Sequence, residues 1–508
     1  MNNEALKNSY DVIVVGAGIG GLTSGALLAK EGKQVLVVEQ EELAGGFARD
    51  FQYGPYRINP ALHVIMGCNP TGNYGQGVID AILKHIGVQD KCEFISVDPF
   101  YRACFPGFQL DVPTGRDAYL EAHLRHFPRE QAGLHKLVDL CSTIYQEFMQ
   151  FPSGSRWQDL ALLPVRYPYL FRHANATVSK VVDRYLGDAK LKSVYSILYP
   201  YLALPPSRLS FLLWAVMMTS YIEQGAFHCL GGFQNLNDAL ADGLARHGGE
   251  LTLGCKVNKI LVNNRHVKGI MLDNGQEINA PVVISNIDAR STFQDLLEEE
   301  QVSSRYLRAL KKMEASSSVL SLCLATDLYI QDLGVPKVTL DSPWDLDASY
   351  AAAMQKHFSG MAIHIPTIVD SSLAPANEHI VFVQAFVPSD AADLTPSEKI
   401  RFAESMLEKA ETVLPELREH VTFVAGASDG SHYQYPLSRL DNIYGWANTT
   451  RQAGVRRLPN KTPITGLYLA GHWTQPGSGI WTVALSGVNA ARYLLGQTMS
   501  KAIWPLEL

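Results

Sequence analysis

The segment from residue 11 to residue 39 constrains the fold of this chain more than any other. A short, mostly β-branched run, Asp11–Val15, leads into the glycine-rich stretch GAGIGG at 16–21, and a helical pattern follows. A second β-branched run at 34–38 ends on Glu39. Continuous apolar runs of this kind are typical of buried parallel strands, so the segment predicts a strand–helix–strand unit. We therefore expect an α/β fold with a Rossmann-type sheet.

Each part of this unit has a mechanical role in holding a dinucleotide. Gly16 permits a tight turn, Gly18 lets the backbone approach a pyrophosphate, and Gly21 lets the helix lie close to the strand. The free N–H groups at the start of the helix then face the phosphates. Glu39 is placed to accept hydrogen bonds from the adenosine ribose, whether the cofactor is FAD or NAD.

Two later features favour FAD. Gly45 and Gly46 follow Glu39 closely, which resembles the extended FAD motif of the glutathione-reductase-like flavoproteins. In addition, a second glycine-rich turn, GLYLAGHWTQPGSGI at 466–480, lies roughly 450 residues after the first. The riboflavin half of FAD needs binding segments far along the chain, whereas an NAD domain does not. We therefore predict FAD.

Size and composition limit the remaining possibilities. A chain of 508 residues exceeds the usual size of one domain, so two lobes are expected. The net charge is −7, and the absence of a Lys/Arg block argues against a nucleic-acid partner. The seven cysteines include no C-x-x-C pair, and the polar N-terminus does not resemble a secretory signal. These patterns predict a reduced, cytoplasmic protein with no metal site.

The apolar stretch Leu209–Ile222 raises the question of a membrane. It is too short to span a bilayer, which takes about 20 residues. A buried helix, the wall of a lipophilic tunnel and a surface that dips into a membrane are all compatible with it. Peripheral membrane association and the oligomeric state stay open at this point.

The order of segments predicts a discontinuous cofactor domain. Helical periodicity at 236–244 is followed by strand patterns through Val257 and Ile260 and by the turn dipeptide Asn274–Gly275. This strand-rich region returns the chain to the nucleotide domain after a long insertion. We expect a Rossmann-type FAD-binding domain from residues 1–100, 230–300 and 451–508, interrupted by an α+β substrate-binding domain from residues 101–229 and 301–450.

Motifs over essentially the whole chain resemble one family. They are GAGIGGL with Glu39 and Gly45–Gly46, RINPALHVIMG (57–67), GGFQNLNDAL (231–240), VVISNIDARST (282–292), YGWANT (444–449) and TPITGLYLAGHWTQPGSGIWTVALSGVNAA (462–491). This set resembles the phytoene desaturase, carotenoid isomerase and retinol saturase family of FAD-dependent oxidoreductases, within the flavin amine oxidase superfamily. The resemblance implies an enzyme for a long, lipophilic, conjugated polyene, acting by desaturation, isomerisation or saturation. Several such relatives are peripheral membrane proteins.

The resemblance also implies positions for the cofactor. Val257 stands where relatives meet the adenine through the backbone, and His472 stands where many relatives have an acidic residue for the ribityl hydroxyls. The expected cofactor-binding residues are Gly16, Gly18, Ile19, Gly20, Gly21, Glu39, Gln40, Gly45, Gly46, Phe47, Ala61, Leu62, Val257, Asn286, Gly471, His472, Gly479, Ile480, Trp481 and Val483.

The candidate catalytic residues are His63, Tyr444 and Trp481. His63 lies where desaturases have an Asp-Ala-Gly-Pro-like stretch, and a histidine there is more typical of the isomerase and saturase branch. His63, Tyr444 and His472 are acid–base candidates, although a structural role is the simpler interpretation for a single histidine. Trp481 either stacks on the flavin or polyene or fills the core.

Other functions stay open. A flavin oxidase of an amine or of an aromatic secondary metabolite is the alternative enzyme. Tyr444 and Trp446 offer aromatic rings for an amine cage, but no lysine stands in that turn. A flavin-bound lipid carrier without catalytic activity is a further alternative, which the nearly complete FAD motif disfavours.

Overall fold

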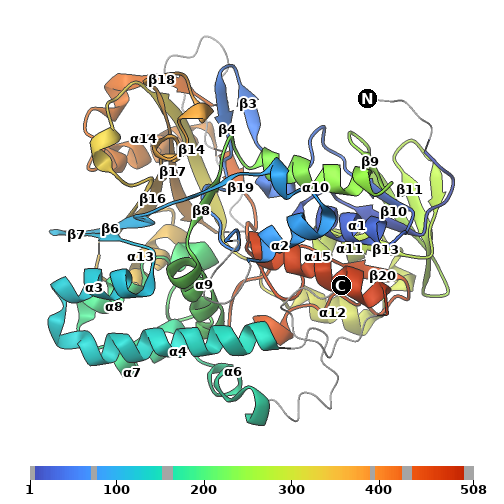
Figure 1. Cartoon of the computed structure of the whole chain (residues 1–508), viewed down its shortest axis with the longest axis horizontal. Coiled ribbons are helices and arrows are strands. Elements are labelled where there is room, and N and C mark those ends of the chain that lie inside the picture. Colours follow the sequence, from blue (N-terminus) through green and yellow to red (C-terminus); the bar gives the residue numbers. More distant parts are fainter. Residues whose placement is uncertain are drawn as a thin grey trace.

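The computed structural model describes residues 6–69, 77–151, 164–341, 343–388, 395–425 and 438–496. The outermost residues of the expected FAD domain, 1–5 and 497–508, lie outside these ranges. Figure 1 shows two lobes, with the first βαβ unit on one side and a large mixed sheet with a helical layer on the other.

The nucleotide lobe is built on a five-stranded parallel sheet in the order β20-β13-β1-β2-β9. This order places the last strand beside β13 from the middle of the chain, and β13 beside β1 from its beginning. The predicted α/β class with a Rossmann-type sheet is thus confirmed. The strands are β1 (Val12–Val15), β2 (Val35–Val38), β9 (Glu250–Thr252), β13 (Val283–Ser285) and β20 (Leu467–Leu469).

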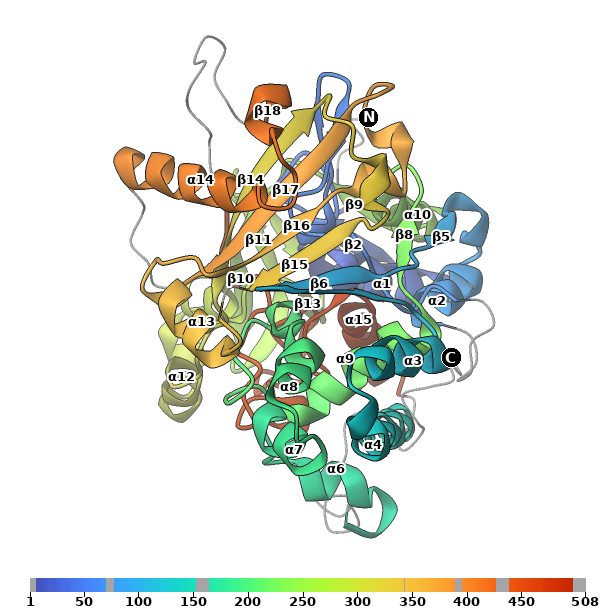
Figure 2. The same cartoon turned by 90° about the vertical axis from the view of Figure 1, so that its left-hand side faces the viewer.

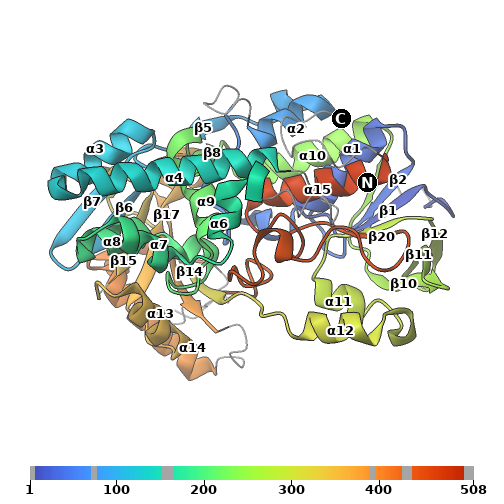
Figure 3. The same ribbon diagram turned by 90° about the horizontal axis from the view of Figure 1, so that it is seen from below.

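Both faces of this sheet are covered, which explains the continuous apolar runs of its strands. Val12 and Val14 of β1 point into a core shared with the helices, whereas Ile13 and Val15 point into a second core shared with a small three-stranded sheet. Figure 3 shows the helices along one side of the parallel strands. The covering elements are α1 (Ile19–Lys30), α2 (Val78–Ile86), α10 (Gln234–Arg246), α15 (Ile480–Leu494), β10 (Val257–Asn263), β11 (His266–Leu272) and β12 (Glu277–Asn279).

The second lobe contains an eight-stranded mixed sheet, whose strands lie side by side in Figure 2. Its faces are chemically different. Leu322, Val338 and Ile363 pack with Phe402 of helix α14 on one face, and polar side chains line a cavity on the other. The strands are β6 (Tyr101–Phe105), β7 (Phe108–Val112), β14 (Ser318–Thr326), β15 (Lys337–Asp341), β16 (Gly360–His364), β17 (His379–Val387), β18 (Val421–Val424) and β19 (Ser438–Leu440).

Helices and two short strand pairs complete the molecule. The pairs are β3 (Phe51–Tyr53) with β4 (Tyr56–Ile58) and β5 (Phe94–Ser96) with β8 (Phe227–Cys229). The helices are α3 (Arg116–His126), α4 (Gln131–Gln150), α6 (Pro168–His173), α7 (Val178–Tyr185), α8 (Ala189–Ser196), α9 (Phe211–Gln224), α11 (Ala289–Gln294), α12 (Ser304–Lys311), α13 (Leu346–Met354) and α14 (Pro396–Ala410).

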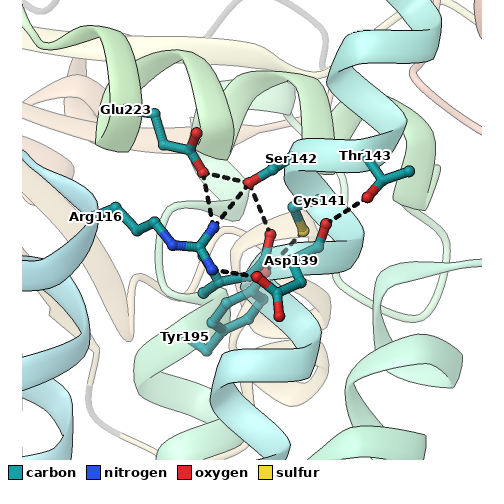
Figure 4. Close-up of polar contacts among 8 residues, drawn as sticks. Arg116, Asp139, Cys141, Ser142, Thr143, Tyr195 and Glu223 are labelled. Atoms are coloured by element: carbon teal, nitrogen blue, oxygen red, sulfur yellow. Dashed lines mark hydrogen bonds and ion pairs between the residues drawn. The ribbon is translucent and has the colours of Figure 1, made fainter. Parts of the chain in front are cut away.

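A polar cluster ties three of these helices together (Figure 4). Arg116 of α3 forms ion pairs with Asp139 of α4 and Glu223 of α9. Ser142 of α4 donates a hydrogen bond to Glu223 and receives one from Arg116, at 3.3 Å. These polar groups satisfy one another, so the cluster has a structural explanation.

The apolar stretch Leu209–Ile222 forms most of α9, which is largely buried. Leu213, Val216 and Met217 of this helix line the cavity described below. The interpretation as a buried helix therefore holds, and the same helix forms part of a cavity wall. Among the described residues, no helix is both long enough and apolar enough to cross a membrane. The predicted domain boundaries stay a prediction.

Candidate active site

A cavity of about 840 Å³ lies between the two lobes. Its lining runs from the glycine turn after β1 to the polar face of the eight-stranded sheet. All three candidate catalytic residues, His63, Tyr444 and Trp481, line it. The expected cofactor residues that also line it are Gly16, Gly18, Ile19, Glu39, Gln40, Gly45, Gly46, Phe47, Ala61, Leu62, Asn286, Gly471, His472, Gly479, Ile480 and Val483.

The turn after β1 forms a cradle whose glycine positions leave no room for a side chain of their own. A Cβ atom at Gly18 would lie 2.8 Å from Nδ2 of Asn286, and Gly16 has a φ of +95°, which favours glycine. Gly45 donates its N–H to the carbonyl oxygen of Ala17 at 2.8 Å. This bond holds the second glycine pair beside the first. The start of α1 has no side-chain cap, so its N–H groups stay available to phosphate oxygens.

Glu39 follows β2 and is 8% exposed. One carboxylate oxygen accepts the N–H of Ala17 at 2.7 Å and the other accepts the N–H of Glu41 at 3.1 Å. These two bonds fix the carboxylate at the cavity wall. Because each oxygen can accept a second hydrogen bond, the group keeps acceptor capacity for vicinal hydroxyls.

Asn286 joins the two glycine turns, a role that the sequence did not indicate. It follows β13 and donates from Nδ2 to the carbonyl oxygen of Gly16 at 3.3 Å. A Cβ atom at Gly471 would lie 2.9 Å from Oδ1 of Asn286. This buried oxygen has no hydrogen-bond partner among the described residues. An unpaired polar atom in a glycine-lined cradle fits a polar ligand.

Three expected cofactor residues do not line the cavity. A Cβ atom at Gly20 would lie 2.8 Å from the backbone nitrogen of Gly471, and one at Gly21 would overlap the carbonyl oxygen of Gly16. These glycines therefore permit close packing of backbone segments. The side chain of Val257 lies in the core beneath the three-stranded sheet. Contact of these three residues with the cofactor stays a prediction.

The second glycine turn leads into the N-terminus of α15. Gly471 donates its N–H to Oγ of Ser486 at 2.7 Å, which ties the turn to this helix. Gly479 is the N-cap residue, and Ile480 begins the helix. The positive end of the helix dipole therefore meets the cavity, where it favours negative charge.

His472 is half-buried and lies between two aromatic side chains. Its ring centroid lies 5.6 Å from that of Phe47 and 5.4 Å from that of Trp473. Burial, with a smaller contribution from Arg457, lowers the pKa of His472 to about 3. The imidazole is therefore neutral at physiological pH and can form hydrogen bonds without supplying a fixed charge.

His63 is held at the junction of the lobes. Asn59 accepts the N–H groups of Ala61 and Leu62 at 3.1 and 2.8 Å, which fixes the turn before His63. The His63 ring lies 4.3 Å from His364, centroid to centroid, and its Nε2 has no partner among the described residues. Burial lowers the pKa of His63 to about 3. The side chain is a weak base at neutral pH but retains one free hydrogen-bonding position.

Tyr444 and Trp481 have different surroundings. Burial raises the pKa of Tyr444, so its phenol stays protonated and can donate a hydrogen bond. Trp481, in the first turn of α15, lies against Phe148 of α4 at 6.1 Å between ring centroids. Trp481 therefore packs as core on one side and borders the cavity on the other. Trp446, by contrast, does not line the cavity and packs against Trp473 at 4.8 Å.

Two buried basic side chains of the site could not be predicted from the sequence. Arg457 lies beneath His472, and Lys337 lies on the cavity wall. Nothing in the local sequence marks either residue, since RRLPN and KVTLD read as an ordinary loop and an ordinary strand. Across the described residues, no three His, Cys, Asp or Glu side chains gather as a metal-binding group.

Comparisons with known proteins agree with this geometry. A family model described as flavin containing amine oxidoreductase matches residues 19–495. The chain belongs to this family, and it is therefore a flavin-dependent oxidoreductase with FAD as its cofactor. The prediction of FAD over NAD is confirmed.

Similar proteins with assigned names include three polyene enzymes. A chloroplastic prolycopene isomerase 1 of an Oncidium hybrid cultivar is 26% identical, with 95% of this chain and 83% of the relative covered. An all-trans-retinol 13,14-reductase of Rattus norvegicus is 26% identical, with 98% and 86% covered. A phytoene dehydrogenase of Streptomyces griseus is 26% identical, with 97% and 96% covered. The resemblance read from the motifs is confirmed.

Solved structures show the same fold. An oxidoreductase from Methanosarcina mazei has a TM-score of 0.61 at 20% identity, over 94% of this chain and 98% of that one. Cyclohexylamine oxidase from Brevibacterium oxydans has a TM-score of 0.59 at 17% identity, over 96% and 99%. The fold is thus an FAD-binding domain combined with a substrate-binding domain.

Proposed function

We propose that this flavoenzyme acts on a long, lipophilic, conjugated polyene of the carotenoid or retinoid type, by desaturation, isomerisation or saturation. The observation that carries the proposal is the wall that α9 contributes to the cavity. Leu213, Val216 and Met217 face the cavity together with the aromatic rings of Tyr199 and Tyr201. This apolar wall suits a hydrocarbon chain. The names of the three polyene-enzyme relatives support the same substrate class.

Different residues of the chain would bind the cofactor, orient the substrate and exclude water. Glu39 would bind the ribose, the N-terminus of α1 the pyrophosphate, and the N-terminus of α15 the negative side of the flavin ring. FAD supplies hydride or electron transfer when bound. His63, with a free Nε2, and Tyr444, a phenol donor, would orient the substrate and hold protons next to the ring. Trp481 would exclude water from that side.

An amine or aromatic-metabolite oxidase is the alternative proposal. The solved amine oxidase of the same fold favours it, but the expected cage is incomplete because only Tyr444 of the Tyr444–Trp446 pair borders the cavity.

Anaerobic incubation of the flavin-loaded protein with a panel of substrates tests the choice. The panel contains a carotenoid, all-trans-retinol and an aliphatic amine. We expect polyene products by chromatography, with bleaching of the yellow flavin absorbance wherever the polyene is oxidised. To cover saturation and isomerisation, the same panel is repeated with flavin reduced beforehand. Bleaching by the amine, with every polyene unchanged in both series, would reject the proposal.

Peripheral membrane association belongs to the same proposal. Phe171 of α6 and Val165, just before this helix, are 58% and 80% exposed. Arg166 and Arg172, which are also exposed, are their neighbours in sequence. This combination suits an interfacial contact with anionic lipid. α6 lies at one extremity of the helical layer in Figures 1 and 2. Flotation with anionic vesicles should recover the protein, and a Val165→Ser, Phe171→Ser double variant should float less. Equal flotation of the two proteins would exclude this surface as the membrane contact.

The cytoplasmic location, supported by seven free cysteines, also stays a proposal.

A further inference from the structure

Lys337 is a buried lysine on the wall of the cavity. It begins β15 and is 2% exposed. Its Nζ atom lies 3.6 Å from the ring centroid of Tyr201 and 5.9 Å from those of Phe100 and Tyr101. Within the described part of the chain, no carboxylate forms an ion pair with it. An aromatic box thus surrounds an amine that has no protein counter-charge.

Such a lysine lowers the stability of the fold when no ligand is bound. Burial of an ammonium group without an anion disfavours its charged form, and burial holds the pKa of Lys337 well below its ordinary value. The ring of Tyr201 compensates only part of that loss. A methionine would fill the same space at lower cost. A lysine retained next to a cavity therefore indicates a ligand with complementary charge.

Further polar groups face the same space. They are Thr339, His364 and also Asp341, which follows Thr339 on the same face of β15. Because β15 and β16 pair with Lys337 opposite His364 and Thr339 opposite Ala362, Lys337, Thr339 and His364 lie on one face of the sheet. All three line the cavity and are buried. Oγ1 of Thr339 and Nδ1 of His364 have no hydrogen-bond partner among the described residues. The three side chains therefore place unpaired polar groups in one region of the cavity wall.

We propose that Lys337, Thr339 and His364 bind a carboxylate at one end of the substrate. The substrate is then a polyene acid, with its hydrocarbon chain along α9 and its acid group on β15 and β16. This inference rests on the proposed polyene function for the identity of the chain, but not for the identity of the acid group. A carboxylate can accept several hydrogen bonds at once, whereas a hydrocarbon end would leave all three groups unpaired.

The experiment compares acids with their methyl esters on flavin-loaded protein. The probes are all-trans-retinoic acid, methyl retinoate, oleate and methyl oleate, and binding is measured by quenching of protein fluorescence. The test variant is Lys337→Met, which removes the charge and keeps the volume. Lys190→Met is the matched control, because Lys190 also lies over an aromatic ring, Trp344, but is exposed and outside the cavity. Thermal unfolding and flavin content verify that each variant is folded and loaded.

We expect the wild type to bind each acid at least about tenfold more tightly than its ester. Lys337→Met should remove this preference while ester binding, flavin content and thermal stability persist. Thr339→Val should weaken acid binding by a smaller factor. Lys190→Met should behave as wild type.

Other results separate the two proposals. An acid preference that survives Lys337→Met overturns the carboxylate site, and so does a wild type that binds acid and ester equally. Unchanged binding with slower flavin reduction in Lys337→Met also overturns it and assigns the lysine to the cofactor. If oleate binds in a Lys337-dependent manner but no retinoid binds or reacts, the carboxylate site stands and the polyene function fails.

Discussion

The guanidinium group of Arg457 donates two hydrogen bonds to the backbone carbonyl oxygen of His472, from Nε at 3.1 Å and from Nη2 at 2.6 Å. Nη2 also donates to the carbonyl oxygen of Tyr444 at 2.7 Å, and Nη1 to Oδ1 of Asn448 at 3.2 Å. Arg457 is 1% exposed, and burial lowers its pKa to about 9. A buried cation thus ties the second glycine turn to the segment that carries Tyr444.

Replacement of Arg457 by methionine should disrupt both segments. The carbonyl oxygens of His472 and Tyr444 would lose their charged donor, so we expect the free energy of unfolding to fall by about 3 kcal/mol or more. Flavin content should fall with it. Urea denaturation and the flavin-to-protein absorbance ratio measure the two effects. Arg456→Met is the control, since Arg456 is exposed. Wild-type stability and flavin content in Arg457→Met would show that the carbonyl groups find other donors.

Gly18→Val should abolish FAD binding. Even the first carbon of the new side chain would approach Nδ2 of Asn286 to 2.8 Å and would occupy the space in front of the N-terminus of α1. The flavin-to-protein ratio after purification measures the loss. Gly187→Val is a suitable control, because that glycine is exposed and the nearest atom belongs to the flexible carboxylate of Glu130. A flavin-replete Gly18→Val protein would contradict the assignment of the cradle.

His63→Phe should keep FAD bound but lower turnover by about tenfold or more, within the range for loss of a proton-holding group. Phenylalanine preserves the ring contacts with His364 and Phe382 but lacks the Nε2 atom, which has no hydrogen-bond partner among the described residues. Product formation per bound flavin is the measurement. His123→Phe, a buried histidine outside the cavity, serves as the control. Full activity in His63→Phe would assign His63 a structural role.

The stability of the fold should decrease in acid, in part because of His123. Burial lowers the pKa of His123 from 6.5 to about 4. Between these values the unfolded chain binds a proton that the folded chain does not, so falling pH favours unfolding; above pH 6.5 the residue has no effect. We expect a loss of about 1.4 kcal/mol per pH unit inside that window.

Denaturant unfolding at a series of pH values tests this prediction. The pH dependence should weaken in His123→Phe but not in His357→Phe, since His357 is exposed. Equal slopes in the two variants would show that His123 is protonated in the folded protein as readily as in the unfolded one.

The first βαβ unit could be predicted from sequence because its signals are local. The strand pattern, the glycines and Glu39 lie within about thirty residues, and the expected sheet, cofactor and family follow from them. The second turn at Gly471 could be predicted because its glycines are visible in the sequence. In addition, FAD is long enough to need a second binding segment far along the chain from the first. Asn286 could be named only through the family motif, and the motif did not indicate that it bridges the two turns.

Other parts of the site depend on pairings that no local pattern records. Lys337 reaches the cavity because β15 pairs with β16 and α14 covers the opposite face of the sheet. Arg457 is buried because the segments around residues 444 and 472 close over it. Gly20 does not line the cavity because it packs against a neighbouring backbone segment. Val257 does not line it because its side chain lies in the core beneath the three-stranded sheet. These outcomes were decided by tertiary packing.

β20 lies at the edge of the parallel sheet, and α15 packs on α1. These two positions determine when the holoenzyme forms during synthesis. A Cβ atom at Gly487 would overlap the carbonyl oxygen of Gly20, so α15 closes directly on the helix that begins the nucleotide lobe. A nascent chain that has emerged only as far as residue 450 lacks this closure and leaves the apolar flank of α1 bare. Capture of the flavin must therefore wait until β20 and α15 have been synthesised, and until then the open flank is a site for aggregation or for chaperone binding.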